Sequence, residues 1–218
     1  MNEMQFLAWV RGPGLDISVG ILVLGVIWRL FEIYSLGRKA DLAQARSRSG
    51  ASGWHTLYRR SLPAPGLLAR SPISYVGGYI FHIGLAIVVF LFAPHIKLAS
   101  LVGLSWPGLP SPVIDGVTVI TLATMLVMLF DRINKPVKRY LSTFEDYFTW
   151  ALTFLPVLTG YLAVKHLLLP YTTMLAVHIL SVELLLIALP FTKLFHAVTV
   201  FGSRWYNGQI NGRRGVPV

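Results

Sequence analysis

Residues 171–201 read YTTMLAVHILSVELLLIALPFTKLFHAVTVF and contain two histidines, His178 and His196. The first part, Tyr171–Leu189, is long and apolar enough to span a bilayer. Pro190 can kink a membrane helix without ending it, so we expect one helix over residues 171–201. On such a helix the two histidines face the same direction about 27 Å apart, near opposite sides of the hydrocarbon core.

Four further segments have the length and apolarity of membrane-spanning helices. They are Leu15–Tyr34, Ile73–Phe92, Val113–Phe130 and Tyr147–Val164. The chain is 55% hydrophobic and 13% charged, which is too apolar for a soluble domain of this size. We therefore predict an all-α membrane protein with five transmembrane helices, forming a single domain over residues 1–218.

Positive charge is concentrated on one side of these helices. Only Arg11, Lys97 and Lys165 lie in the segments on the other side. The fifteen residues on the basic side are Arg38, Lys39, Arg46, Arg48, Arg59, Arg60, Arg70, Arg132, Lys135, Lys138, Arg139, Lys193, Arg204, Arg213 and Arg214. The positive-inside rule predicts an N-terminus outside and a C-terminus in the cytoplasm, in a cell inner membrane. Basic cytoplasmic loops explain the net charge of +10 better than nucleic-acid binding does.

The longest hydrophilic segment, residues 37–72, includes the run RSRSGASG at residues 46–53. This composition cannot bury a core of its own. We predict a basic cytoplasmic loop that is either a docking loop or partly ordered linker, or an anchor to anionic lipid. His55 lies in this loop without apolar neighbours, so we expect it to be solvated.

Histidine is the residue type that points to redox chemistry. The chain has no cysteine, which excludes disulfides, thiolate-held iron–sulfur clusters and covalent haem attachment on this chain. His82 lies inside the second helix, and a histidine buried in a bilayer is costly and usually functional. Three nearby glycines, Gly77, Gly78 and Gly84, would allow a flat macrocycle to approach the backbone. The alternative for His82 is a hydrogen bond between helices.

Topology pairs the membrane histidines by depth. The second helix runs outward and the fifth returns, so His82 should meet His196 on the cytoplasmic side, and His95 should meet His178 on the outer side. Neutral imidazole is an axial haem ligand, so this arrangement predicts two haem b groups, each held by two histidines. On a straight helix His82 and His95 would point in nearly opposite directions, and Pro94 could redirect the backbone.

Three segments resemble a known family. YIFHIG around His82 and LPFTKLFHAVTV around His196 look like the haem-binding segments of the gamma subunit of respiratory nitrate reductase. EDYFTWALTFLPVLTG, at residues 145–160, is similar to that family in character. The resemblance covers most of the chain after Ile73, and the wider family includes cytochrome subunits of heterodisulfide-reductase-like and sulfur-metabolising complexes.

The resemblance implies a di-haem b cytochrome that exchanges electrons with quinone near the outer haem. Near the inner haem, it implies cytoplasmic iron–sulfur and catalytic partner subunits, with no catalytic residue on this chain. His82, His178 and His196 match family ligands. The nitrate reductase members place the remaining ligand about where Phe92 stands, so His95 is a substitute for it.

Quinone chemistry needs a group that can exchange protons beside the haem. Lys97, His166 and Glu183 are the candidates for this role. The alternative for Lys97, and for Lys165 next to His166, is interfacial anchoring. A carboxylate inside the membrane should be protonated, paired or functional, and for Glu183 the alternative is a structural hydrogen bond.

Two other classes of function are compatible with the sequence. One is a haem-free membrane scaffold or transporter subunit whose histidines make hydrogen bonds or bind a metal. The other is a cytochrome with the inner haem alone, held by His82 and His196.

Overall fold

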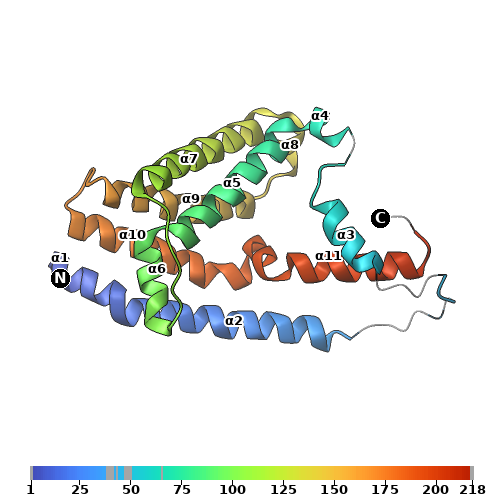
Figure 1. The fold of residues 1–218 in the computed structure, drawn as a ribbon, viewed down its shortest axis with the longest axis horizontal. Helices are drawn as coiled ribbons and strands as arrows, with labels where there is room; N and C mark the ends of the chain where they lie inside the picture. Colours follow the sequence, from blue (N-terminus) through green and yellow to red (C-terminus); the bar gives the residue numbers. More distant parts are fainter. Residues whose placement is uncertain (1, 38–41, 43, 47–50, 65, 217–218) are drawn as a thin grey trace.

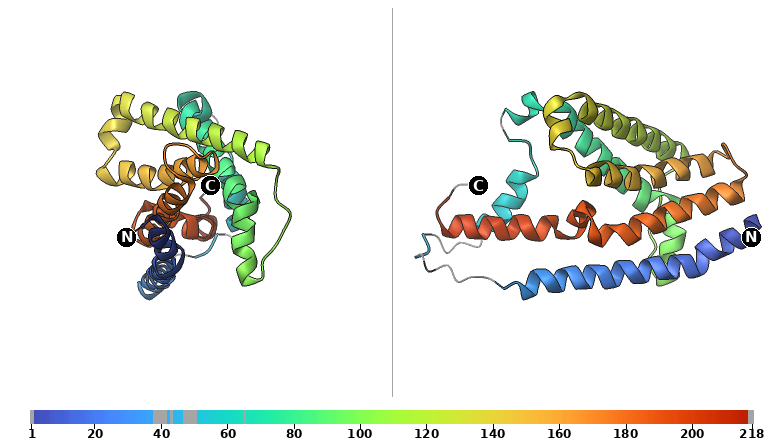
Figure 2. Two further views of the ribbon diagram at one scale, coloured as in Figure 1. Left: turned by 90° about the vertical axis from the view of Figure 1, so that its left-hand side faces the viewer. Right: turned by 180° about the vertical axis from the view of Figure 1, so that it is seen from behind.

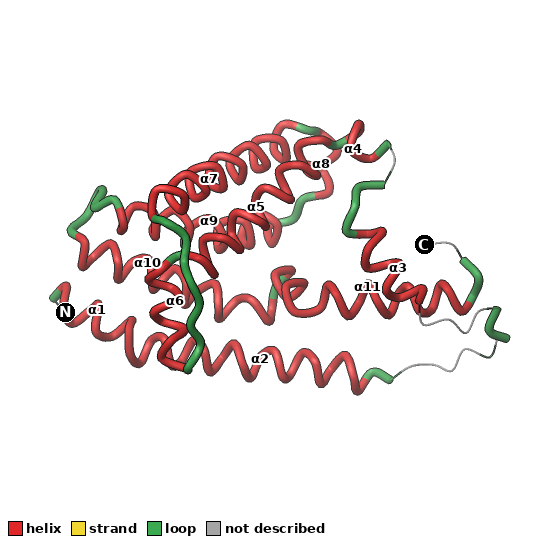
Figure 3. Tube along the Cα trace, in the orientation of Figure 1, coloured by secondary structure: helices red, strands yellow, loops and turns green. Residues whose placement is uncertain are grey.

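The structure is a computed structural model that describes residues 2–37, 42, 44–46, 51–64 and 66–216. Within these residues every regular element is a helix (Figures 1 and 3). Five helices are long and apolar enough to cross a membrane, which supports a multi-pass membrane protein. Three residues used in the charge comparison, Arg38, Lys39 and Arg48, lie outside the described residues.

The described residues form eleven α-helices. They are α1 (Glu3–Trp9), α2 (Leu15–Ser35), α3 (Ala51–Arg60), α4 (Leu67–Arg70), α5 (Pro72–Leu91), α6 (Ala93–Ala99), α7 (Ser111–Asn134), α8 (Pro136–Leu141), α9 (Phe144–Val164), α10 (Tyr171–Ala188) and α11 (His196–Arg213). Short 3₁₀ turns cover Ser100–Val102, Leu189–Phe191 and Lys193–Phe195, and a π-helical turn covers Val10–Gly14. The bounds of the second, third and fourth spans lie within a few residues of those predicted.

The first span begins earlier than predicted, at Glu3 instead of Leu15. Asn2 starts it with a capping box, in which its side chain accepts from the Gln5 amide while Gln5 reaches back to the Asn2 amide. Pro13 has no N–H for a regular helical bond, and the backbone passes it through a π-helical turn without ending the helix.

The fifth span is not one helix over residues 171–201, and that prediction is wrong. α10 ends at Ala188, two 3₁₀ turns follow, and α11 begins at His196. Pro190 ends the regular hydrogen bonding, and Thr192 is extended and caps the next turn by accepting from the Leu194 amide. Pro190 is fully buried against Gly25 of α2, where an added Cβ would lie 2.8 Å from the proline ring.

The second span does not continue as one helix through His95. α5 stops at Leu91, Phe92 is extended, and Pro94 lies in the first turn of the separate helix α6. The last carbonyls of α5 find partners in the following loop, because the Trp106 indole donates to the Phe90 carbonyl and the Leu109 amide donates to the Leu91 carbonyl. Figure 1 shows α6 turned away from the axis of α5.

α10 lies between α9 and α2 in the bundle. α5 packs on α7, which also contacts α9, while α10 packs on α9 and on α2 (Figures 1 and 2). Gly84 permits the first of these contacts, since an added Cβ would lie 2.0 Å from the Thr121 hydroxyl of α7. Among the described elements, α5 does not pack its backbone closely on α10 or α11. The paired rings of the histidine-bearing helices therefore approach one another as side chains, without close backbone packing.

Part of the basic segment 37–72 is folded, as helices α3 and α4. α3 packs on α11, where Thr56 is fully buried against Gly208. An added Cβ at Gly208 would lie 2.4 Å from the Thr56 hydroxyl, so the small residue allows the close approach. His55 is exposed, as predicted.

Candidate functional site

Four histidines form two pairs in the structure. The ring centres of His82 and His196 are 6.2 Å apart, and those of His95 and His178 are 6.3 Å apart. These are the two pairs that the topology predicts. The planes of His82 and His196 are 74° apart, whereas those of His95 and His178 are 20° apart.

The two helix breaks place these rings. Because α6 leaves the axis of α5 after Phe92, His95 is released from the straight-helix geometry that would point it away from the fifth span. Because α10 ends at Ala188, His196 starts a new helix and does not follow the face of His178. The pairs therefore depend on two interruptions, not on five uniform turns of helix.

In three of the rings, a backbone carbonyl next to Nδ1 determines which ring nitrogen carries the proton. His82 Nδ1 lies 2.7 Å from the Gly78 carbonyl, and His196 Nδ1 lies 2.7 Å from the Lys193 carbonyl. His95 Nδ1 lies 3.0 Å from the carbonyl of Val88, in the last turn of α5. A carbonyl only accepts, so in the neutral ring Nδ1 carries the proton and Nε2 keeps its lone pair. Each Nε2 is then a potential metal ligand.

The fourth ring, His178, has two partners on α9, the backbone of Pro156 and the hydroxyl of Thr159. The Thr159 hydroxyl donates to the Leu155 carbonyl at 2.7 Å, and its oxygen lies 3.4 Å from His178 Nδ1. Since the hydroxyl proton is used within α9, the oxygen can accept from Nδ1. Gly160 lets α9 come this close, because an added Cβ would lie 3.0 Å from the His178 ring. Sequence reasoning missed Thr159 and Gly160, although a small residue next to a hydroxyl in a membrane helix was the available signal.

The spacing of each pair fits one metal between two imidazoles. An imidazole nitrogen sits roughly 2 Å from its metal and roughly 1 Å before the ring centre, so opposite ligands have ring centres about 6 Å apart. The observed 6.2 and 6.3 Å agree with this value. Each pair supplies two nitrogen ligands, the number that bis-imidazole haem takes from a protein, whereas structural zinc takes four ligands.

The glycines near His82 have different roles from the one predicted. Gly84 packs against Thr121, and an added Cβ at Gly77 would lie 3.0 Å from Met128. These two glycines therefore serve the contact between α5 and α7, not a macrocycle. Gly78 has no atom within 4 Å of an added Cβ, and its carbonyl accepts from His82. Gly78 alone keeps the open face that was expected of all three.

The three residues predicted for quinone binding are not brought into contact with one another in the described structure. Lys97 is exposed on α6, two residues after His95. His166 is exposed in the left-handed region at φ 55° and stacks on Tyr171 with ring centres 5.0 Å apart. Beside it, the hydrogen bond from Lys165 to Asp115 raises the pKa of Lys165.

Glu183 is buried and turned toward the first span. Its side chain is 3% exposed and faces Gly14 of the π-helical turn, where an added Cβ would lie 2.7 Å from Oε1. In the described residues Oε1 has no hydrogen-bond partner. The structural hydrogen bond considered for Glu183 is therefore absent for this oxygen among the described residues.

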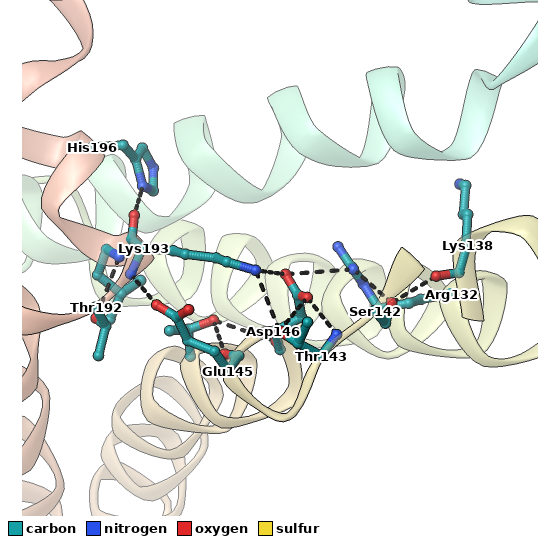
Figure 4. A network of polar contacts seen from close by, with 11 residues as sticks. Arg132, Lys138, Ser142, Thr143, Glu145, Asp146, Thr192, Lys193 and His196 are labelled. Carbon is teal, nitrogen blue, oxygen red and sulfur yellow. Dashed lines mark hydrogen bonds and ion pairs between the residues drawn. The ribbon is translucent and has the colours of Figure 1, made fainter. Parts of the chain in front are cut away.

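A polar network adjoins His196 (Figure 4). Lys193, whose carbonyl accepts from His196, donates its side-chain ammonium to Asp146 at 2.9 Å. The Lys193 amide donates to Glu145 Oε1 at 2.7 Å. Both carboxylates lie in the first turn of α9, which Thr143 caps. Sequence reasoning included these carboxylates only as part of a family-like segment.

Comparison with known proteins identifies one relative. A protein of Nitratidesulfovibrio vulgaris (strain Hildenborough), described as "Protein", is 38% identical to this chain over 136 residues. The match covers 62% of this chain and 60% of that protein, so the chain spans less than two thirds of its relative's length. No protein-family model and no solved structure matches the chain.

Proposed function

We propose that the chain is a b-type cytochrome membrane subunit that transfers electrons between the quinone pool and cytoplasmic redox partners. One observation carries the proposal: His82, His95, His178 and His196 form two pairs with ring centres 6.2 and 6.3 Å apart. A second observation supports it. All four Nδ1 atoms face protein oxygens, which leaves the Nε2 atoms as ligands.

The residues divide into two haem b sites. His82 and His196 would hold the inner haem, and His95 and His178 would hold the outer haem. When bound, haem iron held by two imidazoles would supply one-electron transfer, and the side chains would bind and orient it. The chain orients the rings through their hydrogen bonds. Among the described elements, the backbone of α5 does not pack closely on α10 or α11.

The electron partners follow from the family resemblance and the placement of the two pairs. His95 lies beyond the C-terminal end of α5, and His196 lies beyond the C-terminal end of α10. With the N-terminus outside and the C-terminus in the cytoplasm of a cell inner membrane, the inner pair faces iron–sulfur and catalytic subunits. This is the arrangement implied by the nitrate reductase gamma subunit and the heterodisulfide-reductase-like cytochromes.

Quinone would bind near the outer pair. Lys97 has the strongest support among the expected residues because it is exposed on the same short helix as His95. Glu183 has less support, since its carboxylate faces Gly14 and not the ring pair. His166 lies in the loop that precedes α10, stacked on Tyr171.

Reduction by a quinol tests this function directly. The purified chain, or its native complex, is mixed with a soluble quinol analogue while the b-type absorption bands are recorded, and dithionite gives full reduction. We expect the quinol to produce the reduced b-type bands, and Lys97→Ala to slow this step while leaving the dithionite spectrum unchanged. A b-type spectrum that quinol never changes would remove the quinone link.

The same spectra decide between the two other classes of function. No b-type band in dithionite-reduced protein would indicate a haem-free scaffold or transporter subunit. One haem per chain, retained in His95→Ala, would indicate a cytochrome with the inner haem alone. The similar spacing of the two histidine pairs supports a second haem site over the inner haem alone.

A further inference from the structure

His196 is placed by a segment that has little regular structure of its own. Residues 189–195 make two three-residue 3₁₀ turns on either side of the extended Thr192. Such short turns have few internal hydrogen bonds, so their geometry depends on contacts with other elements. Pro190 is fixed on one side by Gly25 of α2, and Lys193 is fixed on the other by α9.

One residue of this segment, Lys193, joins α9 to the imidazole. Its amide donates to Glu145 Oε1 at 2.7 Å, and its carbonyl accepts from His196 Nδ1 at 2.7 Å. A carboxylate that accepts from a backbone amide makes a charge-assisted bond, which is stronger than a neutral one. Figure 4 shows Glu145, Lys193 and His196 in this order.

A second contact supports the same segment. The Lys193 ammonium lies 2.9 Å from Asp146 Oδ1. Asp146 is itself held, because the Thr143 amide donates to its Oδ2 at 2.8 Å and Arg132 lies 3.8 Å from its Oδ1. The first turn of α9 is therefore a rigid base for Lys193.

We propose that Glu145 is a positioning residue for His196. By holding the amide of Lys193, it fixes the carbonyl of the same residue in the direction that His196 Nδ1 needs. This sets the orientation of the ring and keeps the proton on Nδ1, so that Nε2 faces His82. The inference rests on the proposed function, because the ring that Glu145 positions is taken to be an axial ligand.

The test compares Glu145→Ala, Glu145→Gln and the control Glu32→Ala. Glu32 is also a carboxylate at the inward end of a span, but its ion pair is with Arg29, three residues before it. Loss of an outer-shell partner typically weakens metal binding about 10- to 100-fold. Glu145 acts on that partner, Lys193, so we expect Glu145→Ala to weaken inner-haem binding by up to that factor. Glutamine keeps an oxygen that can accept from Lys193, so Glu145→Gln should retain most of the binding.

Three measurements read out the effect: haem per chain, the electron paramagnetic resonance signal of the oxidised inner haem, and amide hydrogen exchange at Lys193. We expect Glu145→Ala to shift the inner signal and to speed Lys193 exchange, with the outer signal unchanged. An unchanged inner signal and haem content in Glu145→Ala would overturn the inference and leave the proposed function standing. Equal losses in all three variants would also overturn it. A wild-type chain without haem would overturn both.

Discussion

The imidazole planes of His95 and His178 lie 20° from parallel with their ring centres 6.3 Å apart, although the two residues lie on different helices, α6 and α10. The inner pair has nearly the same separation but a plane angle of 74°. The angle differs because each ring follows its own acceptor: the Val88 carbonyl for His95, Thr159 for His178, Gly78 for His82 and Lys193 for His196.

The difference in plane angle predicts two distinguishable haems. In low-spin ferric haem the angle between the axial imidazole planes controls the splitting of the iron d orbitals. We expect two electron paramagnetic resonance signals, with the more anisotropic one from the inner, nearly perpendicular pair. His82→Ala should remove that signal alone. A single signal that accounts for two haems would contradict the different ring angles.

Thr159 should matter for the outer haem only. Thr159→Val keeps nearly the same shape but removes the oxygen that can accept from His178 Nδ1. Outer-shell losses of this kind typically cost about 10- to 100-fold in affinity, which haem titration of the haem-free protein would measure. Thr153→Val is the matched control, since the Thr153 hydroxyl donates to carbonyls of its own helix. Equal effects of the two substitutions would exclude a specific role for Thr159.

Gly84 should be required for the packing of α5 on α7. In Gly84→Ala the new methyl group would lie 2.0 Å from the Thr121 hydroxyl, so the helices must move apart. Overpacking of this kind costs about 1–3 kcal/mol, measurable as a lower unfolding temperature in detergent. Gly116→Ala on α7 is the control, because an added Cβ there has no atom within 4 Å. If both variants unfold at the wild-type temperature, the close approach is not needed.

The orientation can be tested by cysteine labelling, since the natural chain has no cysteine. Leu104 lies between the second and third spans and Tyr140 between the third and fourth, and both side chains are exposed. In intact cells an impermeant maleimide should label Leu104→Cys, whereas Tyr140→Cys should react after the membrane is opened. The reverse pattern would place the N-terminus in the cytoplasm.

The five spans were predictable because long apolar segments carry a strong signal. Hydrophobicity and length identify all five spans, and a membrane interior requires a backbone that satisfies its own hydrogen bonds, which favours helices. The interruptions were harder to predict because each depends on contacts far away in the sequence. Pro190 ends α10 where Gly25 of another helix accommodates it, and the turn at Phe92 depends on Trp106 and Leu109 from the following loop.

The pairing of the histidines was predictable from depth, but the reason was partly wrong. The argument that His178 and His196 share one helix face fails, because seven residues between α10 and α11 are not α-helical. The pairs form nevertheless, since depth in the membrane is set by the spans and not by the face of one helix. The partners Thr159, Gly160 and Glu145 depend on how α9 meets α10 and Lys193, which no local pattern shows.

The most direct test of the central claim is the number of haems per chain in the purified protein and in four single variants, by pyridine haemochrome assay. We expect two haem b per wild-type chain. We expect one in each of His82→Ala, His196→Ala, His95→Ala and His178→Ala, with the first two losing the same haem and the last two losing the other. A wild-type chain without haem, or a His82→Ala chain that keeps both haems, would contradict the account.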